Sequence, residues 1–251
     1  YASQRGHFVT LIEKQNELDG FFRLACDLFP PNRIFLDSLL GQLKALPIDL
    51  KLGEEATTEL ISKLVPEAII VATGGRFESP RLPGDEADHV IRGKAVVEWI
   101  SQNRDELDER SVGQKVVIIG AGLIGLELTE FLARRGRRVH LLEPSRRLAM
   151  PAGQKRRGVH TSQLDRLGVP INTGVEIQEI TNDGVLLSLQ SGSQKLVAAD
   201  TIFVVGHPEP NPDSLEPFAH LAETVHAVGD NTGFGLSKKA LTDALEIAYA
   251  L

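Results

Sequence analysis

Short runs of apolar, β-branched residues alternate along this chain with longer stretches in which apolar positions recur at helical spacing. The apolar runs predict β-strands over residues 8–12, 69–72, 116–119, 139–142, 201–205 and 225–228. The helical spacing predicts helices over residues 35–46, 96–107, 123–135, 154–167 and 237–250. Several strands are continuously apolar, which is typical of parallel strands buried on both faces. Strand followed by helix, repeated, indicates an α/β fold.

Residues 169–197 depart from this alternation. Polar turns separate three short apolar segments, expected as strands over residues 175–180, 185–189 and 195–197. The turn Asn182-Asp183-Gly184 contains the Asp-Gly pair that is typical of a β-hairpin. We therefore expect an antiparallel crossover attached to the second half of the chain.

Three glycines follow the strand expected at residues 116–119. Gly120, Gly122 and Gly125 have the spacing G-x-G-x-x-G. In this arrangement the first glycine permits a tight turn, the second lets a pyrophosphate approach the backbone, and the third lets the helix pack on the strand. With a strand before it and a helix after it, the pattern predicts a dinucleotide site rather than a purely structural turn.

The residues around this turn complete the predicted site. Leu123 and Ile124 begin the next helix, whose N–H groups and positive dipole end favour a phosphate. Glu143 ends the following strand, where an acid accepts hydrogen bonds from the adenosine ribose. A carboxylate there would repel the 2′-phosphate of NADPH, so we expect NADH. An arginine nearby can instead accommodate the 2′-phosphate of NADPH, and a solvated surface is the alternative role for such residues. The arginines expected around Glu143 are Arg137, Arg138, Arg146 and Arg147.

A partial copy of this pattern lies near the start of the chain. Superposing Glu13 on Glu143 also aligns five identical pairs, Arg5 with Arg135, Gly6 with Gly136, Val9 with Val139, Leu11 with Leu141 and Leu18 with Leu148. The chain is therefore expected to hold two Rossmann-like dinucleotide-binding domains. By the same offset, the strand and glycine loop of the first copy would precede Tyr1, so we expect a longer polypeptide.

Proline-rich connections suggest where these domains meet. Residues 77–88 and 205–217 are rich in proline, and the intact glycine pattern lies between them. This order indicates one domain inserted into another. We expect a first domain at residues 1–92 and 200–251, and an inserted second domain at residues 93–199.

Charge and cysteine content exclude several function classes. The net charge of −7 argues against a nucleic-acid partner. The single cysteine, Cys26, excludes an internal disulfide and an iron–sulfur cluster ligated by cysteines of this chain. A single cysteine also fits the reducing cytoplasm. No apolar run is long enough for a bilayer, and the histidines lack metal-ligand spacing. The basic run Lys155-Arg156-Arg157 is expected to be a solvated helix face.

Several segments together resemble a known flavoprotein superfamily, the pyridine nucleotide-disulphide reductases. They are Glu13-Lys14, Gly20-Phe21-Phe22-Arg23-Leu24-Ala25, Ala72-Thr73-Gly74-Gly75 and Ala227-Val228-Gly229-Asp230. The second of these and Gly235-Leu236-Ser237-Lys238-Lys239-Ala240 more particularly resemble the C-terminal half of the 2,4-dienoyl-CoA reductase, trimethylamine dehydrogenase and histamine dehydrogenase group. In that group an N-terminal barrel with FMN and an iron–sulfur cluster precedes two nucleotide domains. Asp19 departs from the group, in which a second glycine usually precedes Gly20.

The resemblance implies where cofactors bind. Glu13, beside Lys14 and Gly20, would bind the adenosine ribose of FAD, or of ADP in relatives without that flavin. Ala72-Thr73-Gly74 would bring a backbone turn against this nucleotide, and Gly229-Asp230 would meet its ribitol or pyrophosphate. Asp230 also follows an apolar strand, where such sheets bind ligands, although a turn or N-cap role is the alternative. Glu127 matches a position near the nicotinamide amide, and a helix-dipole role is its alternative.

These features predict the nucleotide-binding portion of an FAD-dependent NAD(P)H oxidoreductase. Hydride would pass from NAD(P)H to the flavin, and electrons would continue to an FMN and iron–sulfur barrel domain or partner subunit. No side chain of this chain is expected to be catalytic, because the cofactors carry the chemistry. The alternative is a non-catalytic, ADP-binding structural or regulatory module of a larger dehydrogenase.

Overall fold

The computed structural model describes residues 1–18, 20–104, 106–108, 110–149, 152–189 and 191–251. Asp19, where the sequence departs from the family pattern, lies outside the described residues. The chain forms two compact units, the first comprising Tyr1–Arg23, Pro31–Arg76 and Pro208–Leu251 and the second comprising Leu24–Pro30 and Phe77–His207. In the described ranges, no helix has both the length and the apolar character needed to cross a membrane.

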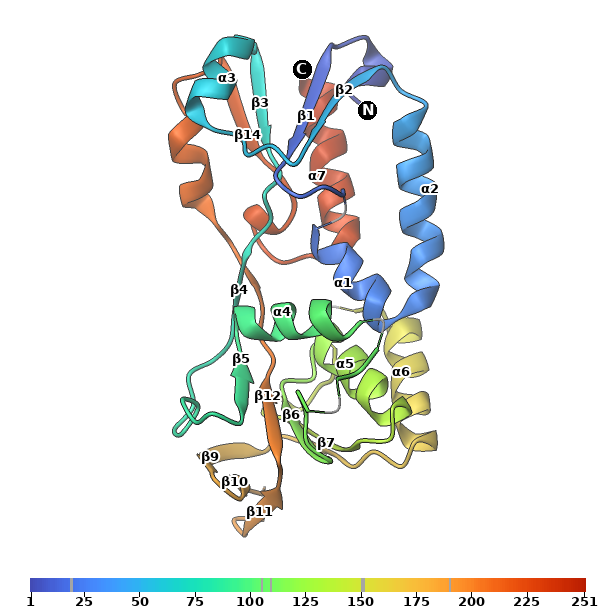
Figure 1. The fold of residues 1–251 in the computed structure, drawn as a ribbon, viewed down its shortest axis with the longest axis vertical. Helices are drawn as coiled ribbons and strands as arrows, with labels where there is room; N and C mark the ends of the chain where they lie inside the picture. The colour runs from blue at the N-terminus through green and yellow to red at the C-terminus, as the bar shows by residue number, and fades with distance from the viewer. Residues whose placement is uncertain (19, 105, 109, 150–151, 190) are drawn as a thin grey trace. The chain divides into compact units, whose positions relative to one another are not determined.

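The second unit is built on a five-stranded sheet whose neighbouring strands are all parallel (Figure 1). In spatial order its strands are β5 (Val90–Arg92), β12 (Thr201–Val204), β6 (Lys115–Ile119), β7 (Arg138–Glu143) and β8 (Ile171–Thr173). Every residue of β12 is buried, as are the last four residues of β6. The predicted continuous apolar strands therefore lie at the centre of a covered parallel sheet, as expected for an α/β fold.

Three helices and a second sheet accompany this core. The helices are α4 (Lys94–Asn103), α5 (Leu123–Arg134) and α6 (Gln154–Arg166). The expected hairpin is confirmed as an antiparallel sheet of β9 (Glu176–Thr181), β10 (Gly184–Ser188) and β11 (Gln194–Ala198). Its buried side chains, including Val185 and Leu187, join Val117 and Ile202 of the parallel sheet in one apolar cluster. The crossover is thus anchored on the sheet that carries the glycine turn.

The first unit contains two separate pairs of parallel strands. One pair is β1 (Val9–Glu13) with β2 (Ile48–Leu52), and the other is β3 (Ala68–Val71) with β14 (Thr224–Ala227). Its helices are α2 (Arg33–Lys44), α3 (Thr58–Leu64) and α7 (Leu236–Ala250). Helix α1 (Gly20–Leu28) begins in the first unit and ends in the second.

Most predicted elements are confirmed, with ends displaced by one or two residues. The helix expected over residues 96–107 is the main correction, because α4 ends at Asn103. There the Asn103 amide donates to the carbonyl of Trp99 at 2.9 Å and accepts the N–H of Asp108 at 3.0 Å, which turns the chain out of the helix. The apolar patterns did not predict α1, β2, α3, β5, β8, the short strands β4 (Arg76–Glu78) and β13 (His207–Glu209), or the 3₁₀ turns at Ser3–Arg5, Pro30–Asn32, Pro212–Phe218 and Gly229–Asn231.

The borders of the compact units differ from the predicted domain limits. They fall after Arg23, Pro30, Arg76 and His207, whereas the sequence predicted limits after residues 92 and 199. The physical reason is strand pairing: in β12, Ile202 lies opposite both Val90 of β5 and Val117 of β6. Hydrogen bonding therefore assigns β5 and β12 to the unit that contains the glycine turn.

Candidate functional site

The three glycines form the turn between β6 and α5. Gly120 has φ +102°, which side-chain-bearing residues rarely adopt, and a Cβ there would collide with the carbonyl oxygen of Val205. A Cβ on Gly125 would collide with the carbonyl oxygen of Gly120. By contrast, a Cβ on Gly122 would meet no described atom within 4 Å. The first and third glycines are therefore needed for the turn itself, whereas the second leaves the backbone open to a ligand.

Helix α5 begins at this turn with features that suit an anion. Gly122 is its N-cap, and its first turn, which contains Leu123 and Ile124, has no acidic residue. The first N–H groups of a helix lack intrahelical acceptors, and the helix dipole makes this end positive. The turn and helix can therefore hold a phosphate group through backbone contacts.

Glu143, at the end of β7, is joined directly to the glycine turn. Its Oε2 accepts the N–H of Ala121 at 2.5 Å, and its Oε1 accepts the N–H of Ser145 at 2.8 Å. These bonds hold a half-buried carboxylate beside the turn. The structure thus brings together the acid and the glycines that the sequence paired, while a contact with ribose stays a prediction.

The arginines expected around Glu143 separate into two groups. Arg138 begins β7 and Glu143 ends it, so roughly 16 Å of strand lies between them. Arg137 donates from Nη1 to Oε1 of Gln114 at 3.2 Å, at the same end as Arg138. The prediction that these two arginines surround Glu143 was wrong, because a strand carries its two ends to opposite edges of the sheet. Arg146 and Arg147 follow Glu143 and are exposed.

Glu127 lies in a buried polar cluster rather than on an open helix face. Its side chain has 0% exposure and forms an ion pair with Arg156 of α6. Arg156 in turn lies over the ring of Phe29, 4.3 Å from its centroid. The expectation that Arg156 belongs to a solvated helix face was therefore wrong. The sequence held no signal for this pairing, because the residues come from three segments that only the fold brings together.

In the first unit, the carboxyl ends of β3 and β14 bring two predicted segments together. Ala72-Thr73-Gly74 follows β3, and Gly229-Asp230 follows β14. Nδ2 of Asn231 donates to Oγ1 of Thr73 at 3.2 Å across this edge. Gly74 and Gly229 have φ values of +78° and +68°, a region that favours glycine. Both turns therefore lie where parallel sheets bind ligands.

Asp230 sits in a charged turn before α7. It is half-buried, and its Oδ1 accepts the N–H of Gly235 at 3.3 Å. Burial raises the pKa of the Asp230 carboxyl, while the Gly235 N–H and the Lys239 charge oppose this rise. Nearby, the hydrogen bond from Lys239 lowers the pKa of Asp243, which also accepts the N–H of Gly229 at 2.9 Å.

Asp230→Asn should stabilise the free protein at neutral pH. The pKa of Asp230 is higher in the folded state than in the unfolded state. Between these two pKa values the folded state binds more protons than the unfolded state, so the free energy of unfolding falls as the pH rises through this range. Removing the charge removes this loss, so we expect a higher unfolding temperature at pH 7 than in the parent, with the difference shrinking below pH 4. Thermal unfolding across pH, with the exposed Asp183→Asn as control, measures this. A lower unfolding temperature at pH 7 would contradict it.

Glu13, Lys14 and Gly20 lie at and after the end of β1, which belongs to the other strand pair of the same unit. Glu13 ends β1, and its Oε1 accepts the N–H of Gln15 at 2.8 Å. Lys14 is exposed, and Gly20 begins α1 with φ +50°. Throughout the described residues, no hydrogen bond or ion pair connects this group to Thr73 or Asp230. Their common role in one site therefore stays a prediction.

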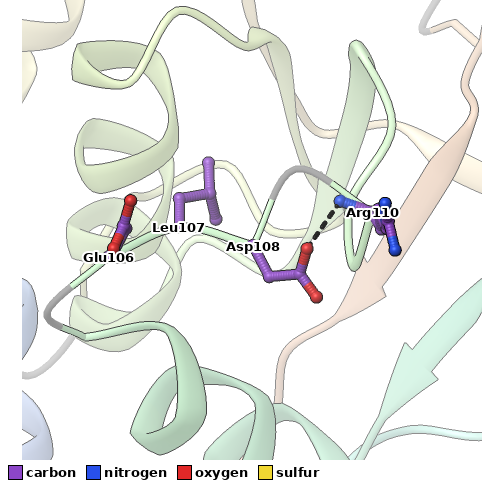
Figure 2. Close-up of a pocket in the computed structure, with 4 residues that line it drawn as sticks. All are labelled: Glu106, Leu107, Asp108 and Arg110. Carbon is purple, nitrogen blue, oxygen red and sulfur yellow. Dashed lines mark hydrogen bonds between the residues drawn. The ribbon is translucent and has the colours of Figure 1, made fainter.

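A surface hollow in the second unit is lined by none of these predicted residues. It is lined by Glu106, Leu107, Asp108 and Arg110, and the N–H of Arg110 donates to Oδ1 of Asp108 at 2.9 Å (Figure 2). No glycine of the turn and no predicted site residue lines it. Elsewhere too, the described part of the chain contains no group of three His, Cys, Asp or Glu side chains suited to a metal ion.

Comparison with known sequences gives one family match and a series of longer relatives. The family described as pyridine nucleotide-disulphide oxidoreductase matches residues 48–228. Bilirubin reductase of Mediterraneibacter gnavus is 30% identical over 233 residues, which cover 91% of this chain and 34% of that protein. NADH oxidase of Thermoanaerobacter brockii is 27% identical over 261 residues, covering 100% of this chain and 38% of the relative.

Solved structures share the fold over the entire chain. A 2-naphthoyl-CoA reductase in complex with 2-naphthoyl-CoA has a TM-score of 0.87 and 26% identity, over 100% of this chain and 37% of that one. Histamine dehydrogenase from Rhizobium sp. 4-9 has a TM-score of 0.82 and 18% identity, over 100% of this chain and 39% of that one. This chain thus spans well under half the length of each of these four relatives.

Proposed function

Because the chain belongs to the pyridine nucleotide-disulphide oxidoreductase family, we propose that it is the nucleotide-binding portion of an FAD-dependent NAD(P)H oxidoreductase. The observation that carries the proposal is the junction of Glu143 with the glycine turn. In it one carboxylate oxygen accepts the N–H of Ala121 at 2.5 Å, directly beside the open Gly122. An anion-binding helix start and a ribose-binding acid are thereby held side by side.

The second unit is the proposed NAD(P)H-binding domain. The residues present fit a dinucleotide, since Gly122 leaves the backbone open and Gly120 and Gly125 admit no side chain. In this assignment the backbone from Gly122 to Gly125 holds the pyrophosphate, and Glu143 holds the adenosine ribose. Leu123 and Ile124 contribute through their backbone at the start of α5.

NADH is the proposed nucleotide, in preference to NADPH. Glu143 would repel a 2′-phosphate, and Arg137 and Arg138 lie at the opposite end of β7. Arg147 remains the candidate for contact with the adenosine half of the cofactor. Its carbonyl accepts a hydrogen bond from Oγ of Ser145 at 2.8 Å, which ties its backbone into the turn that follows Glu143.

The first unit is the proposed site of FAD, or of ADP. Thr73-Gly74 and Gly229-Asp230 fit such a group, because two glycines with positive φ and one carboxylate meet at the edge formed by β3 and β14. Glu13, Lys14 and Gly20 would hold the adenosine end, and Ala72 would add backbone contacts. When bound, the nicotinamide and the flavin supply hydride transfer, and the side chains of this chain bind and orient them.

The proposed reaction continues outside these 251 residues. Relatives named bilirubin reductase, NADH oxidase and cinnamate reductase share this segment under different names. That variety supports a segment which supplies electrons, while a separate catalytic domain or partner subunit, carrying FMN and an iron–sulfur cluster, selects the substrate. The cytoplasm is the proposed location, since one cysteine permits no internal disulfide.

The absorption spectrum of the purified full-length protein tests this function. We expect flavin bands that bleach when NADH is added without oxygen, together with FAD among the nucleotides released on denaturation. A colourless protein that releases ADP would contradict the proposal and support the non-catalytic ADP-binding module. Flavin bands that do not respond to NADH would contradict the assignment of the second unit.

A further inference from the structure

Two turns of the first unit continue beyond the ends of paired strands. Strands β3 and β14 are paired as far as Val71 and Ala227, and the N–H of Val228 adds a last bond to the carbonyl oxygen of Val71 at 3.1 Å. The turns Thr73-Gly74 and Gly229-Asp230 follow outside this pairing. Strand pairing therefore ends before the residues that are proposed to face the nucleotide, and another contact must fix one turn against the other.

The side chain of Asn231 spans the two turns. It has 1% exposure, and its Nδ2 donates to Oγ1 of Thr73, an exposed residue, at 3.2 Å. On the other side of the amide, Oγ of Ser214 donates to Oδ1 of Asn231 at 3.0 Å. Leaving either end of a buried amide without a partner costs free energy. The amide therefore favours the arrangement in which Thr73 and Ser214 both stay in place.

The backbone of Asn231 is fixed as well. Its carbonyl oxygen accepts the N–H of Asn211 at 3.0 Å. Asn211 is the N-cap of the 3₁₀ turn Pro212–Phe218, which contains Ser214. One segment thus holds both the backbone and the amide of Asn231, so Thr73 is attached to a rigid support.

The turn before Asn231 is held from helix α7. Oδ2 of Asp243 accepts the N–H of Gly229 at 2.9 Å, and Nζ of Lys239 donates to the carbonyl oxygen of Gly229 at 3.0 Å. Both backbone groups of Gly229 therefore have partners within the chain. The turn can offer a ligand the carboxylate of Asp230, which is half-buried between two fixed residues.

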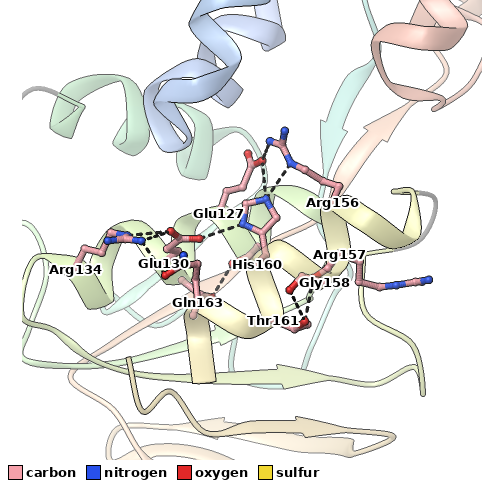
Figure 3. A network of polar contacts seen from close by, with 11 residues as sticks. Glu127, Glu130, Arg134, Arg156, Arg157, Gly158, His160, Thr161 and Gln163 are labelled. Carbon is pink, nitrogen blue, oxygen red and sulfur yellow. Dashed lines mark hydrogen bonds and ion pairs between the residues drawn. The ribbon is translucent and has the colours of Figure 1, made fainter. Parts of the chain in front are cut away.

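The buried network around His160 provides a comparison within the same chain. Figure 3 shows it between α5 and α6, where Nδ1 of His160 lies 3.1 Å from Oε2 of Glu130 and Nη2 of Arg134 lies 2.8 Å from Oε1 of Glu130. These three residues all belong to the second unit. That network joins two helices, whereas the network of Asn231 joins two turns that are proposed to face a ligand.

We infer that Asn231 is a positioning residue of the nucleotide site in the first unit: its amide fixes the Thr73-Gly74 turn relative to the Gly229-Asp230 turn before the nucleotide binds. The inference rests on the proposed binding of FAD or ADP by this unit. A preformed site loses less binding free energy to the ordering of its own residues. The sequence did not indicate this role, because Thr73 and Ser214 lie 158 and 17 positions away from Asn231.

Substitutions at both ends of the bond between Asn231 and Thr73 test the inference in the full-length protein. Thr73→Val removes the hydroxyl group at an exposed position and keeps the shape of the side chain, whereas Thr73→Ser keeps the hydroxyl group. Asn231→Ala removes the amide, and the double variant Asn231→Ala/Thr73→Val completes a double-mutant cycle. Asn103→Ala is the matched control, because Asn103 is a buried amide of the second unit with partners on both its nitrogen and its oxygen.

Titration calorimetry with FAD and with ADP, after removal of the bound nucleotide, measures the effect beside the unfolding temperature of each apoprotein. We expect Thr73→Val and Asn231→Ala each to bind the nucleotide about tenfold more weakly than the parent. The double variant should also bind about tenfold more weakly, instead of the about hundredfold that independent effects would give. Thr73→Ser and Asn103→Ala should bind within about twofold of the parent, although Asn103→Ala should unfold at a lower temperature.

Nucleotide binding by Thr73→Val that equals binding by the parent would overturn the inference. A hundredfold loss in the double variant would also overturn it, because the two residues would then act separately. Equal weakening in Asn103→Ala would assign the effect to a general loss of stability and overturn it too. If Asn231→Ala does not fold, the comparison of Thr73→Val with Thr73→Ser decides, and equal binding by these two overturns the inference. If the parent binds neither FAD nor ADP, the proposed function of the first unit itself fails, and the inference fails with it.

Discussion

Gly122→Ala should weaken NADH binding by about a hundredfold, or about 2.7 kcal/mol, while leaving the fold in place. Its φ of −61° is accessible to alanine, and a Cβ there would meet no described atom within 4 Å. The cost to folding is then limited to about 1 kcal/mol for alanine at an N-cap. The methyl group would instead occupy the space through which a pyrophosphate must approach the backbone. Titration calorimetry with NADH, beside thermal unfolding, measures both effects.

Gly158→Ala is the matched control for this substitution. Gly158 lies within α6, and a Cβ there also meets no described atom within 4 Å. Alanine should stabilise the helix by about 1 kcal/mol and leave NADH binding unchanged. If Gly122→Ala bound NADH as well as Gly158→Ala does, the turn would not be the pyrophosphate site.

Glu143→Ala should lower kcat/KM for NADH by about ten- to a hundredfold and shift the preference toward NADPH. Two effects add: the ribose loses its acceptor, and the buried N–H of Ala121 loses the acceptor that holds it. An unmet buried donor costs about 1–3 kcal/mol. NADPH should suffer less, because the variant no longer places a negative charge beside its 2′-phosphate.

Oxidation of NADH and of NADPH, followed with an artificial electron acceptor in the full-length protein, measures this shift. Glu176→Ala, at an exposed position on β9, should leave both rates unchanged. An unchanged ratio of NADH to NADPH oxidation in Glu143→Ala would count against Glu143 as the ribose-binding acid. If that unchanged ratio came with an equal loss of activity for both nucleotides, the role of Glu143 would be support of the turn alone.

Helices and strands with many buried apolar residues were predictable from the sequence, whereas short or exposed elements were not. Strand β6 and helix α5 surround the glycine turn with buried apolar residues, and both were predicted nearly to their ends. Strand β2 was missed because it has no fully buried residue and exposes Leu50 and Leu52. Helix α3 has seven residues, too few for the periodic spacing to be recognised.

Unit borders and side-chain partners required the tertiary structure. The sequence predicted a domain limit after residue 199, whereas the second compact unit extends to His207 and includes β12, which pairs with β6. Similarly, Arg156 belongs to a basic run that resembles a solvated surface, but packing turns it onto Glu127 and Phe29. No local sequence pattern indicates the unit to which β12 belongs or the partners of Arg156, because both depend on which distant segments become neighbours.

By itself, the sequence determined the α/β class, the glycine turn and the acid that follows it. Those features are local: glycine spacing, apolar runs and turn residues act on the backbone within a few positions of themselves. The tertiary structure alone decided that Glu143 bonds to the turn and that Glu127 is buried against Arg156 and His160. These are decided by packing, since the free energy of a buried charge depends on the groups that the fold places beside it.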